Sequence, residues 1–175
     1  MGIGIVVCGL NGCGKSTLGK ALAEQMGIHY IDNEDLFFSR ASTDEPYANP
    51  RSRAEVEELL ISEVKRYKDF VFAAVKGDYG KEIHQFYEYA VLIEVPKEIR
   101  MQRVRNRSFQ KFGNRMLEGG DLHQAEEQFF EMVESRTDAH VEKWVQSLQC
   151  PVIRVDGTLP IVENVHFILK QIGKS

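Results

Sequence analysis

The sequence predicts a three-layer α/β domain built on a five-stranded parallel sheet. Short apolar runs typical of strands alternate along the chain with segments of helical periodicity. Several runs are apolar at nearly every position, as expected for strands that helices cover on both faces. The first run leads into a glycine-rich stretch and then a helix, an order found in parallel α/β domains. Ligands of such domains bind at the carboxyl ends of the strands.

The first half of the chain holds three of the expected strands. The run from Ile3 to Cys8 is nearly all apolar, and a run that ends at Asp32 follows the first helix. Ser52 and Glu55 have the spacing of a capping box, which marks the start of another helix. The expected strands cover residues 3–8, 28–31 and 70–75, a helix covers 18–26, another begins at 52, and residues 42–50 form a loop.

The second half holds the other two strands and longer helices. Asp121 begins a second capping signature, and the helical pattern after it is expected to break near Thr137. Pro160 stands where the last helix starts, as is common for proline. The expected strands cover 90–95 and 151–155, the helices cover 81–89 and 97–107 with others starting at 121 and 160, and loops or turns lie at 112–114, 119–120 and 156–158.

Composition favours a single ordinary globular domain over residues 1–175. The chain is 43% hydrophobic and 27% charged, and its net charge of −4 gives no reason to expect a nucleic acid polymer as partner. No apolar run approaches the roughly 18 residues of a membrane span, and no signal peptide is recognisable. The cysteines Cys8, Cys13 and Cys150 form no metal-ligand spacing, so a reduced, cytoplasmic setting is expected.

The most specific motif lies between the first strand and the first helix. It fits the pattern G-x-x-x-x-G-K-[ST], in which backbone N–H groups cradle phosphate oxygens. Lys15 is expected to reach the β- and γ-phosphates of a nucleotide, and the Ser16 hydroxyl to bind Mg²⁺. The predicted nucleotide-binding residues are Gly9, Leu10, Asn11, Gly12, Cys13, Gly14, Lys15, Ser16 and Thr17. We therefore expect ATP and Mg²⁺ as cofactors.

The segment after the fourth strand carries arginines at helical spacing. Arg103 and Arg107 share one helix face, where guanidinium groups could neutralise a transferring phosphoryl group. With the preceding Val95-Pro96, the segment resembles the small P-loop kinases, a group that includes nucleoside monophosphate, shikimate and gluconate kinases. The resemblance implies strand order 2-3-1-4-5, catalytic roles for Arg103 and Arg107, and a small helical lid at roughly 103–136. A solvated basic helix face is the alternative interpretation.

Two further stretches extend this resemblance. The turn Asp156-Gly157-Thr158 is similar to the turn that borders adenine in adenylate kinases, which implies that Gly157 and Thr158 bind the nucleotide. In lid-bearing kinases an arginine before the last strand reaches the phosphates, which places Arg136 among the candidates. An ordinary strand-to-helix turn and an ion-paired arginine are the alternatives.

Acidic residues follow the second strand, where shikimate and gluconate kinases carry an Asp-x-Asp-like pattern. Asp32 is followed by Glu34 and Asp35, so the second acid departs from that pattern. Asp32 could hold Mg²⁺ with Ser16, and Asp32 or Asp35 could accept the proton of an attacking hydroxyl. The alternative is that Asp32 only caps the next helix. The third strand ends in Ala73-Ala74-Val75, so the usual acidic residue is missing there.

These observations predict an ATP-dependent phosphotransferase that acts on a small-molecule acceptor similar to those of shikimate and gluconate kinases. A nucleoside or nucleoside monophosphate kinase is the first alternative. A nucleotide-binding regulatory protein with little or no turnover is the second. The sequence identifies neither the acceptor nor the oligomeric state. Cys13, inside the glycine-rich loop, could make the site sensitive to thiol oxidation.

Overall fold

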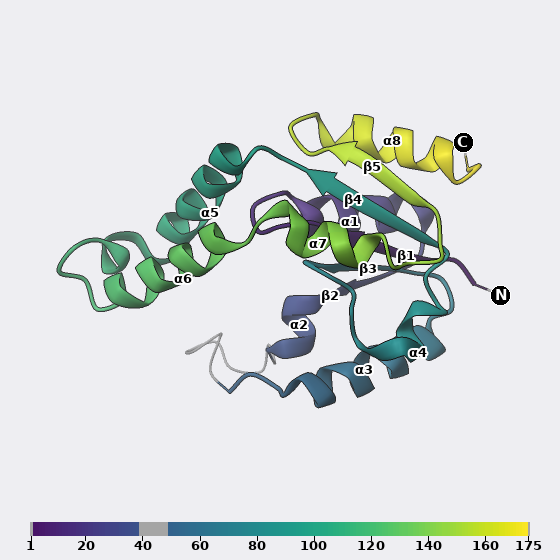
Figure 1. Cartoon of the computed structure of the whole chain (residues 1–175), viewed down its shortest axis with the longest axis horizontal. Helices are drawn as coiled ribbons and strands as arrows, with labels where there is room; N and C mark the ends of the chain where they lie inside the picture. The colour runs from purple at the N-terminus through teal and green to yellow at the C-terminus, as the bar shows by residue number, and fades with distance from the viewer. Residues whose placement is uncertain (1, 39–48, 175) are drawn as a thin grey trace.

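A computed structural model of the chain describes residues 2–38 and 49–174 (Figure 1). Its centre is a five-stranded parallel sheet with strand order β2-β3-β1-β4-β5, which confirms the predicted fold class and order. The expected loop at 42–50 lies mostly outside the described residues. The strands are β1 (Gly4–Cys8), β2 (His29–Asp32), β3 (Phe70–Ala74), β4 (Tyr89–Glu94) and β5 (Val152–Asp156).

The central strands are apolar because both faces of the sheet are covered. Every residue of β1 and β3 is buried, and alternate side chains point to opposite faces. Ile5 and Val7 pack against α1 and α8, whereas Val6 and Phe72 pack against α3, α4 and α7 (Figure 1). The helices are α1 (Lys15–Met26), α2 (Asn33–Phe37), α3 (Arg53–Arg66), α4 (Gly80–His84), α5 (Lys97–Phe112), α6 (His123–Ser135), α7 (Asp138–Val145) and α8 (Ile161–Gln171).

Helices α5 and α6 form an arm that extends away from the sheet (Figure 1). A short 3-10 helix, η1 (Gly113–Met116), joins the two. The arm has its own apolar cluster, made of Val104, Met116, Phe130 and Val133. We call residues Lys97–Ser135 the α5–α6 arm. It is a separate packing unit attached to the edge of the sheet where ligands are expected.

The local sequence signals hold in part. The Ser52 capping box is present, and Thr137 separates α6 from α7 as predicted. The helix expected at 81–89 is shorter, because α4 ends at His84 and β4 begins at Tyr89. The predicted cap at Asp121 is wrong, since its carboxylate accepts two hydrogen bonds from Arg115 at 3.0 and 2.7 Å instead. No described helix has the length and apolar character needed to cross a membrane.

Candidate functional site

The glycine-rich loop turns sharply between β1 and α1. Gly12 and Gly14 have φ angles of +82° and +92°, which residues with a side chain rarely adopt. A Cβ atom on Gly12 would lie 2.4 Å from the carbonyl oxygen of Arg100, so the loop lies directly against α5. No side chain caps the first turn of α1 and no acidic residue lies in it. Its N–H groups and dipole therefore favour an anion at this end.

Lys15 lies at the start of α1 and is partly buried. Burial lowers the pKa of Lys15 from its ordinary value of 10.5. The positive charges of Arg107 and Arg136 also lower this pKa, whereas Asp32 opposes the shift. The charges of Asp32, Arg107 and Arg136 thus all act on Lys15, although they come from different elements.

A cavity of about 560 Å³ lies beside the loop, at the carboxyl ends of β2 and β3. Five predicted site residues line it, namely Asn11, Lys15, Ser16, Asp32 and Arg107. Asp35 does not line the cavity, whereas Glu34 does. The remaining lining residues come from α2, β3, the residue after each of these elements, and the arm: Asn33, Phe37, Phe38, Ala73, Ala74, Val75, Ser108, Lys111, Phe112, Glu126 and Phe129.

Asp32 is held in place by two hydrogen bonds. The Tyr30 hydroxyl donates to Asp32 Oδ2 at 2.7 Å, and the Glu34 N–H donates to Asp32 Oδ1 at 2.9 Å. The same Tyr30 oxygen lies 3.2 Å from the carbonyl oxygen of Ser16. Asp32 therefore caps α2, as the structural alternative predicts, and also lines the cavity beside Ser16.

Three predicted arginines approach the loop differently. Arg103 donates to the carbonyl oxygens of Gly12 at 3.3 Å and Gly157 at 3.1 Å. Arg136 donates to Asn11 Oδ1 at 2.9 Å. Arg107 is exposed and lines the cavity instead. All three thus gather around one loop although they come from different parts of the chain.

The other arginines of this region have structural partners. Arg100 is 4% exposed and donates to the carbonyl oxygens of Val95 at 3.1 Å and Asn11 at 3.4 Å. Arg105 pairs with Glu127 at 3.4 Å, and Arg115 pairs with Asp121. Each of these three arginines therefore has a protein partner that explains its position.

The Asp-Gly-Thr turn lies against the loop but outside the cavity. A Cβ atom on Gly157 would lie 2.8 Å from the carbonyl oxygen of Cys13, and only glycine fits so close an approach. Thr158 donates from its N–H and its hydroxyl to Asp156 Oδ1, at 2.8 and 2.6 Å. Gly157 thus borders the loop on the side of Arg103, and Thr158 follows it in the same turn.

Known proteins resemble this chain along most of its length. A family model described as an AAA domain matches residues 5–116, from β1 through the glycine-rich loop to η1. The chain belongs to this AAA domain family. It is also 27% identical to the "Uncharacterized protein YqaC" of Bacillus subtilis (strain 168), over 98% of both chains.

Solved structures share the fold of this AAA domain. Shikimate kinase from Aquifex aeolicus vf5 superimposes with a TM-score of 0.54 and 19% identity, over 98% of this chain and 96% of that one. Deoxyadenosine kinase from M. mycoides superimposes with a TM-score of 0.56 and 12% identity, over 98% and 99%. The fold is therefore that of the P-loop kinases, as the sequence resemblance predicts.

Sequence reasoning did not single out several residues of the cavity. Phe37, Phe112 and Phe129 bring aromatic rings from three different helices, and Glu126 adds a carboxylate from α6. Asn33 is held by Tyr79, whose hydroxyl donates to Asn33 Oδ1 at 2.5 Å. No motif marks these positions, because the packing of the arm against the sheet edge brings them together.

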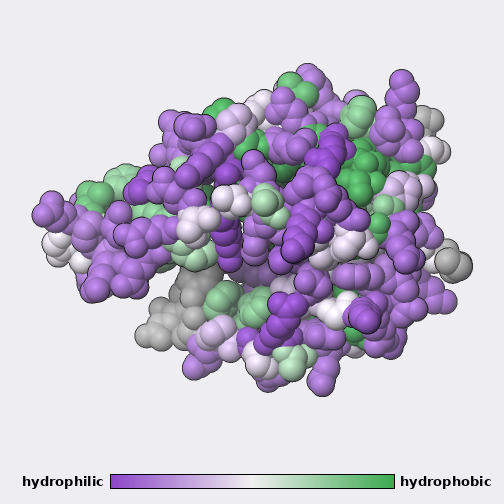
Figure 2. Space-filling view, viewed as in Figure 1, coloured by the Kyte–Doolittle hydropathy of each residue, from purple (hydrophilic) through white to green (hydrophobic). Residues whose placement is uncertain are grey.

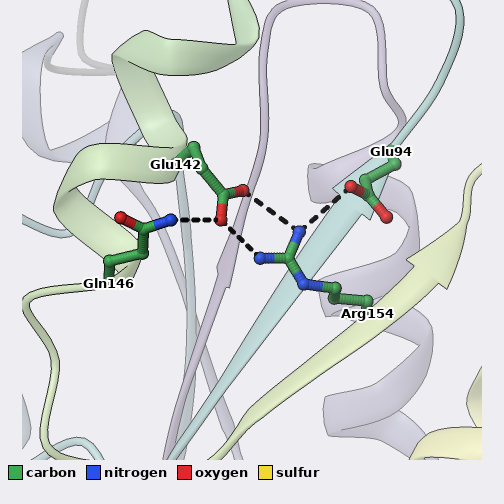
Figure 3. A network of polar contacts seen from close by, with 4 residues as sticks. All are labelled: Glu94, Glu142, Gln146 and Arg154. Atoms are coloured by element: carbon green, nitrogen blue, oxygen red, sulfur yellow. Dashed lines mark hydrogen bonds and ion pairs between the residues drawn. The ribbon is translucent and has the colours of Figure 1, made fainter.

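This AAA domain has a second cavity of about 500 Å³, beside β4, β5 and α7. Arg154 lies at its wall and bridges Glu94 at 3.1 Å and Glu142 at 2.5 Å (Figure 3). Gln146 donates to the same Glu142 carboxylate at 3.1 Å. The network joins α7 to two strands. Its ion pairs are substantially exposed, so each adds little stability.

The thiol of Cys13 is shielded. Cys13 is 1% exposed and packs in the apolar cluster beneath α1. Cys8 is fully buried, and burial raises its pKa to about 12. These features argue against thiol chemistry at the loop.

Proposed function

We propose that the protein is an ATP-dependent phosphotransferase that moves the γ-phosphoryl group of ATP–Mg²⁺ to a small-molecule acceptor. One observation carries the proposal. Lys15 and Ser16 of the phosphate loop line the same cavity as Asp32 and Arg107, and that cavity has room for more than a phosphate. The fold shared with shikimate and deoxyadenosine kinases supports the same reaction class.

Nucleotide phosphates would bind to the loop residues from Gly9 to Thr17 and to the first turn of α1. The transferring phosphoryl group would be neutralised by four cations near this loop. They are Lys15 of the loop itself, Arg103 and Arg107 of α5, and Arg136 after α6. Gly157 and Thr158 would border adenine, because their turn packs on the loop beside Arg103. Residues 1–175 would then form one kinase domain whose lid is the segment at roughly 103–136.

Ser16 and Asp32 fit a magnesium site. Mg²⁺ is commonly bound by one or two protein oxygens together with substrate phosphates and water. Both residues line the cavity, and Tyr30 connects them through its hydroxyl. In the described ranges no group of three or more His, Cys, Asp or Glu side chains could hold a metal alone. When bound, Mg²⁺ would supply charge neutralisation at the phosphates.

Asp32 is the preferred proton acceptor for the attacking hydroxyl. It lines the cavity and its orientation is fixed by Tyr30 and by the N–H of Glu34. Asp35 is exposed and outside the lining, so its role as a base is the weaker proposal. Alignment of acceptor and phosphate would provide most of the rate enhancement, and the arm would exclude water that competes as acceptor.

Variants of two lysines on α1 test the proposal. Lys15→Met should lower ATP-dependent phosphorylation across a panel of alcohols by about 100-fold or more, the scale of losing one charge-stabilising group. Lys20→Met changes an exposed lysine of the same helix and should keep full activity. Full activity in Lys15→Met would contradict the site. Tight ATP binding without turnover on any acceptor would instead indicate the regulatory alternative.

A further inference from the structure

One buried carboxylate oxygen beside the cavity has no hydrogen-bond partner among the described residues. Glu126 Oε2 is buried, and the described residues offer it no hydrogen bond. A buried carboxylate oxygen without a donor is costly, and native structures keep such atoms where a ligand or water completes them. Because Glu126 also lines the cavity, a ligand bound there that donates a hydrogen bond could satisfy this oxygen after a small side-chain rotation.

Aromatic rings face the same space from two sides. Phe37 comes from α2 beside the sheet, whereas Phe112 and Phe129 come from the arm. Phe37 packs against Tyr79 with ring centroids 6.3 Å apart, so the core supports it from behind. Figure 2 shows a small group of hydrophobic residues over α2, bordered by hydrophilic ones. A flat ring that enters between α2 and the arm would gain stacking of about 1–3 kcal/mol.

The charges of the cavity disfavour an anionic acceptor. Two of the cations that line the cavity, Lys15 and Arg107, lie on the side of the phosphate loop and would be engaged by ATP. Lys111 stacks over Phe112 at 5.3 Å, and the charges of Glu34 and Glu126 act on it. Among the described residues that line the cavity, an acceptor carboxylate or phosphate would meet these carboxylates and no pair of arginines.

We propose that the acceptor is a neutral alcohol bearing a flat heteroaromatic ring with an amino group, the chemistry of adenosine and cytidine. The proposal rests on the phosphotransferase function above. The ring would stack among Phe37, Phe112 and Phe129, and its amino group would donate to Glu126 Oε2. The alcohol oxygen would form a bond to the γ-phosphorus while the bond to the β–γ bridging oxygen breaks. ADP leaves with that electron pair, and the hydroxyl proton passes to Asp32.

Matched nucleoside pairs test the role of Glu126. Calorimetry in the presence of a non-hydrolysable ATP analogue would compare adenosine with inosine and cytidine with uridine. The amino member of at least one pair should bind about tenfold more tightly, which corresponds to about 1.4 kcal/mol. Glu126→Gln should remove or reverse this preference, because an amide can also donate to a ring carbonyl.

Glu127→Gln is the control, since Glu127 pairs with Arg105 and does not line the cavity. It should leave the amino preference intact. No binding of any nucleoside, or an unchanged preference in Glu126→Gln, would overturn the inference. Suppose instead that the wild type, but not Lys15→Met, phosphorylates an anionic alcohol such as shikimate. That result would overturn the inferred acceptor class and leave the proposed phosphotransferase function standing. Nucleoside binding without phosphoryl transfer would keep the ring site and refute the phosphotransferase.

Discussion

Replacing Gly12 by alanine tests how closely the phosphate loop lies against α5. The residue has a φ of +82°, and a left-handed backbone costs a residue with a side chain about 1–2 kcal/mol. The new Cβ would also lie 2.4 Å from the backbone oxygen of Arg100, which belongs to a helix and cannot rotate away. Overpacking of this kind adds about 1–3 kcal/mol. The free energy of unfolding of Gly12→Ala should therefore fall by about 2–5 kcal/mol.

Gly27→Ala is a matched control at the other end of α1. Gly27 has a φ of +65°, but a Cβ atom there would meet nothing within 4 Å, so only the backbone cost of about 1–2 kcal/mol applies. For a chain of this size 1 kcal/mol changes Tm by about 2–4 °C. Denaturant unfolding and thermal melting of both variants give the comparison. Equal losses of stability in the two variants would refute a close contact between the loop and α5.

Two further predictions concern titration and thiol chemistry. Lys15→Met should raise the free energy of unfolding at pH 7, because burial lowers the pKa of Lys15 and the unfolded chain binds its proton more tightly. The free energy of unfolding of the wild type then rises with pH as the pH approaches 10.5, the ordinary pKa of lysine. The difference in stability between Lys15→Met and the wild type should therefore shrink as the pH rises. A constant difference between pH 7 and 10 would contradict this. Iodoacetamide on the native protein should modify the half-buried Cys150 first and spare Cys8 and Cys13, as read by mass spectrometry. Loss of ATP binding in step with labelling of Cys13 would contradict the burial of that thiol.

The strands were predictable because their signals are local, whereas their order in the sheet was predicted from the resemblance to the small P-loop kinases. A run such as Phe70-Val71-Phe72 is apolar on both faces of a strand, and only a doubly covered sheet buries it fully. The position at which the short helix α4 ends was not predictable. The helix ends at His84, and beyond it the Tyr87 hydroxyl donates to the carbonyl oxygen of Gly77 at 2.9 Å, a tertiary contact that periodicity does not reveal.

The candidate site likewise contains residues that the sequence marks and residues that it does not. The loop around Lys15 could be predicted because its chemistry is encoded in consecutive residues. Phe37, Phe112 and Glu126 have no such pattern and meet only through the tertiary position of the arm. For Asp32 the sequence left two interpretations, a cap of the next helix or a residue of the site. Both hold, because Asp32 accepts the hydrogen bond from the Glu34 N–H and also lines the cavity.

Helix α5 acts as a lever between the two halves of the site. Arg100 and Arg103 fasten its first half to the phosphate loop, and Lys111 lies in the cavity wall roughly 16 Å further along the axis. A small rotation at the fastened end becomes a larger displacement at the far end, because the helix is continuous between them. A ligand that shifts the loop would therefore also shift this wall of the acceptor cavity.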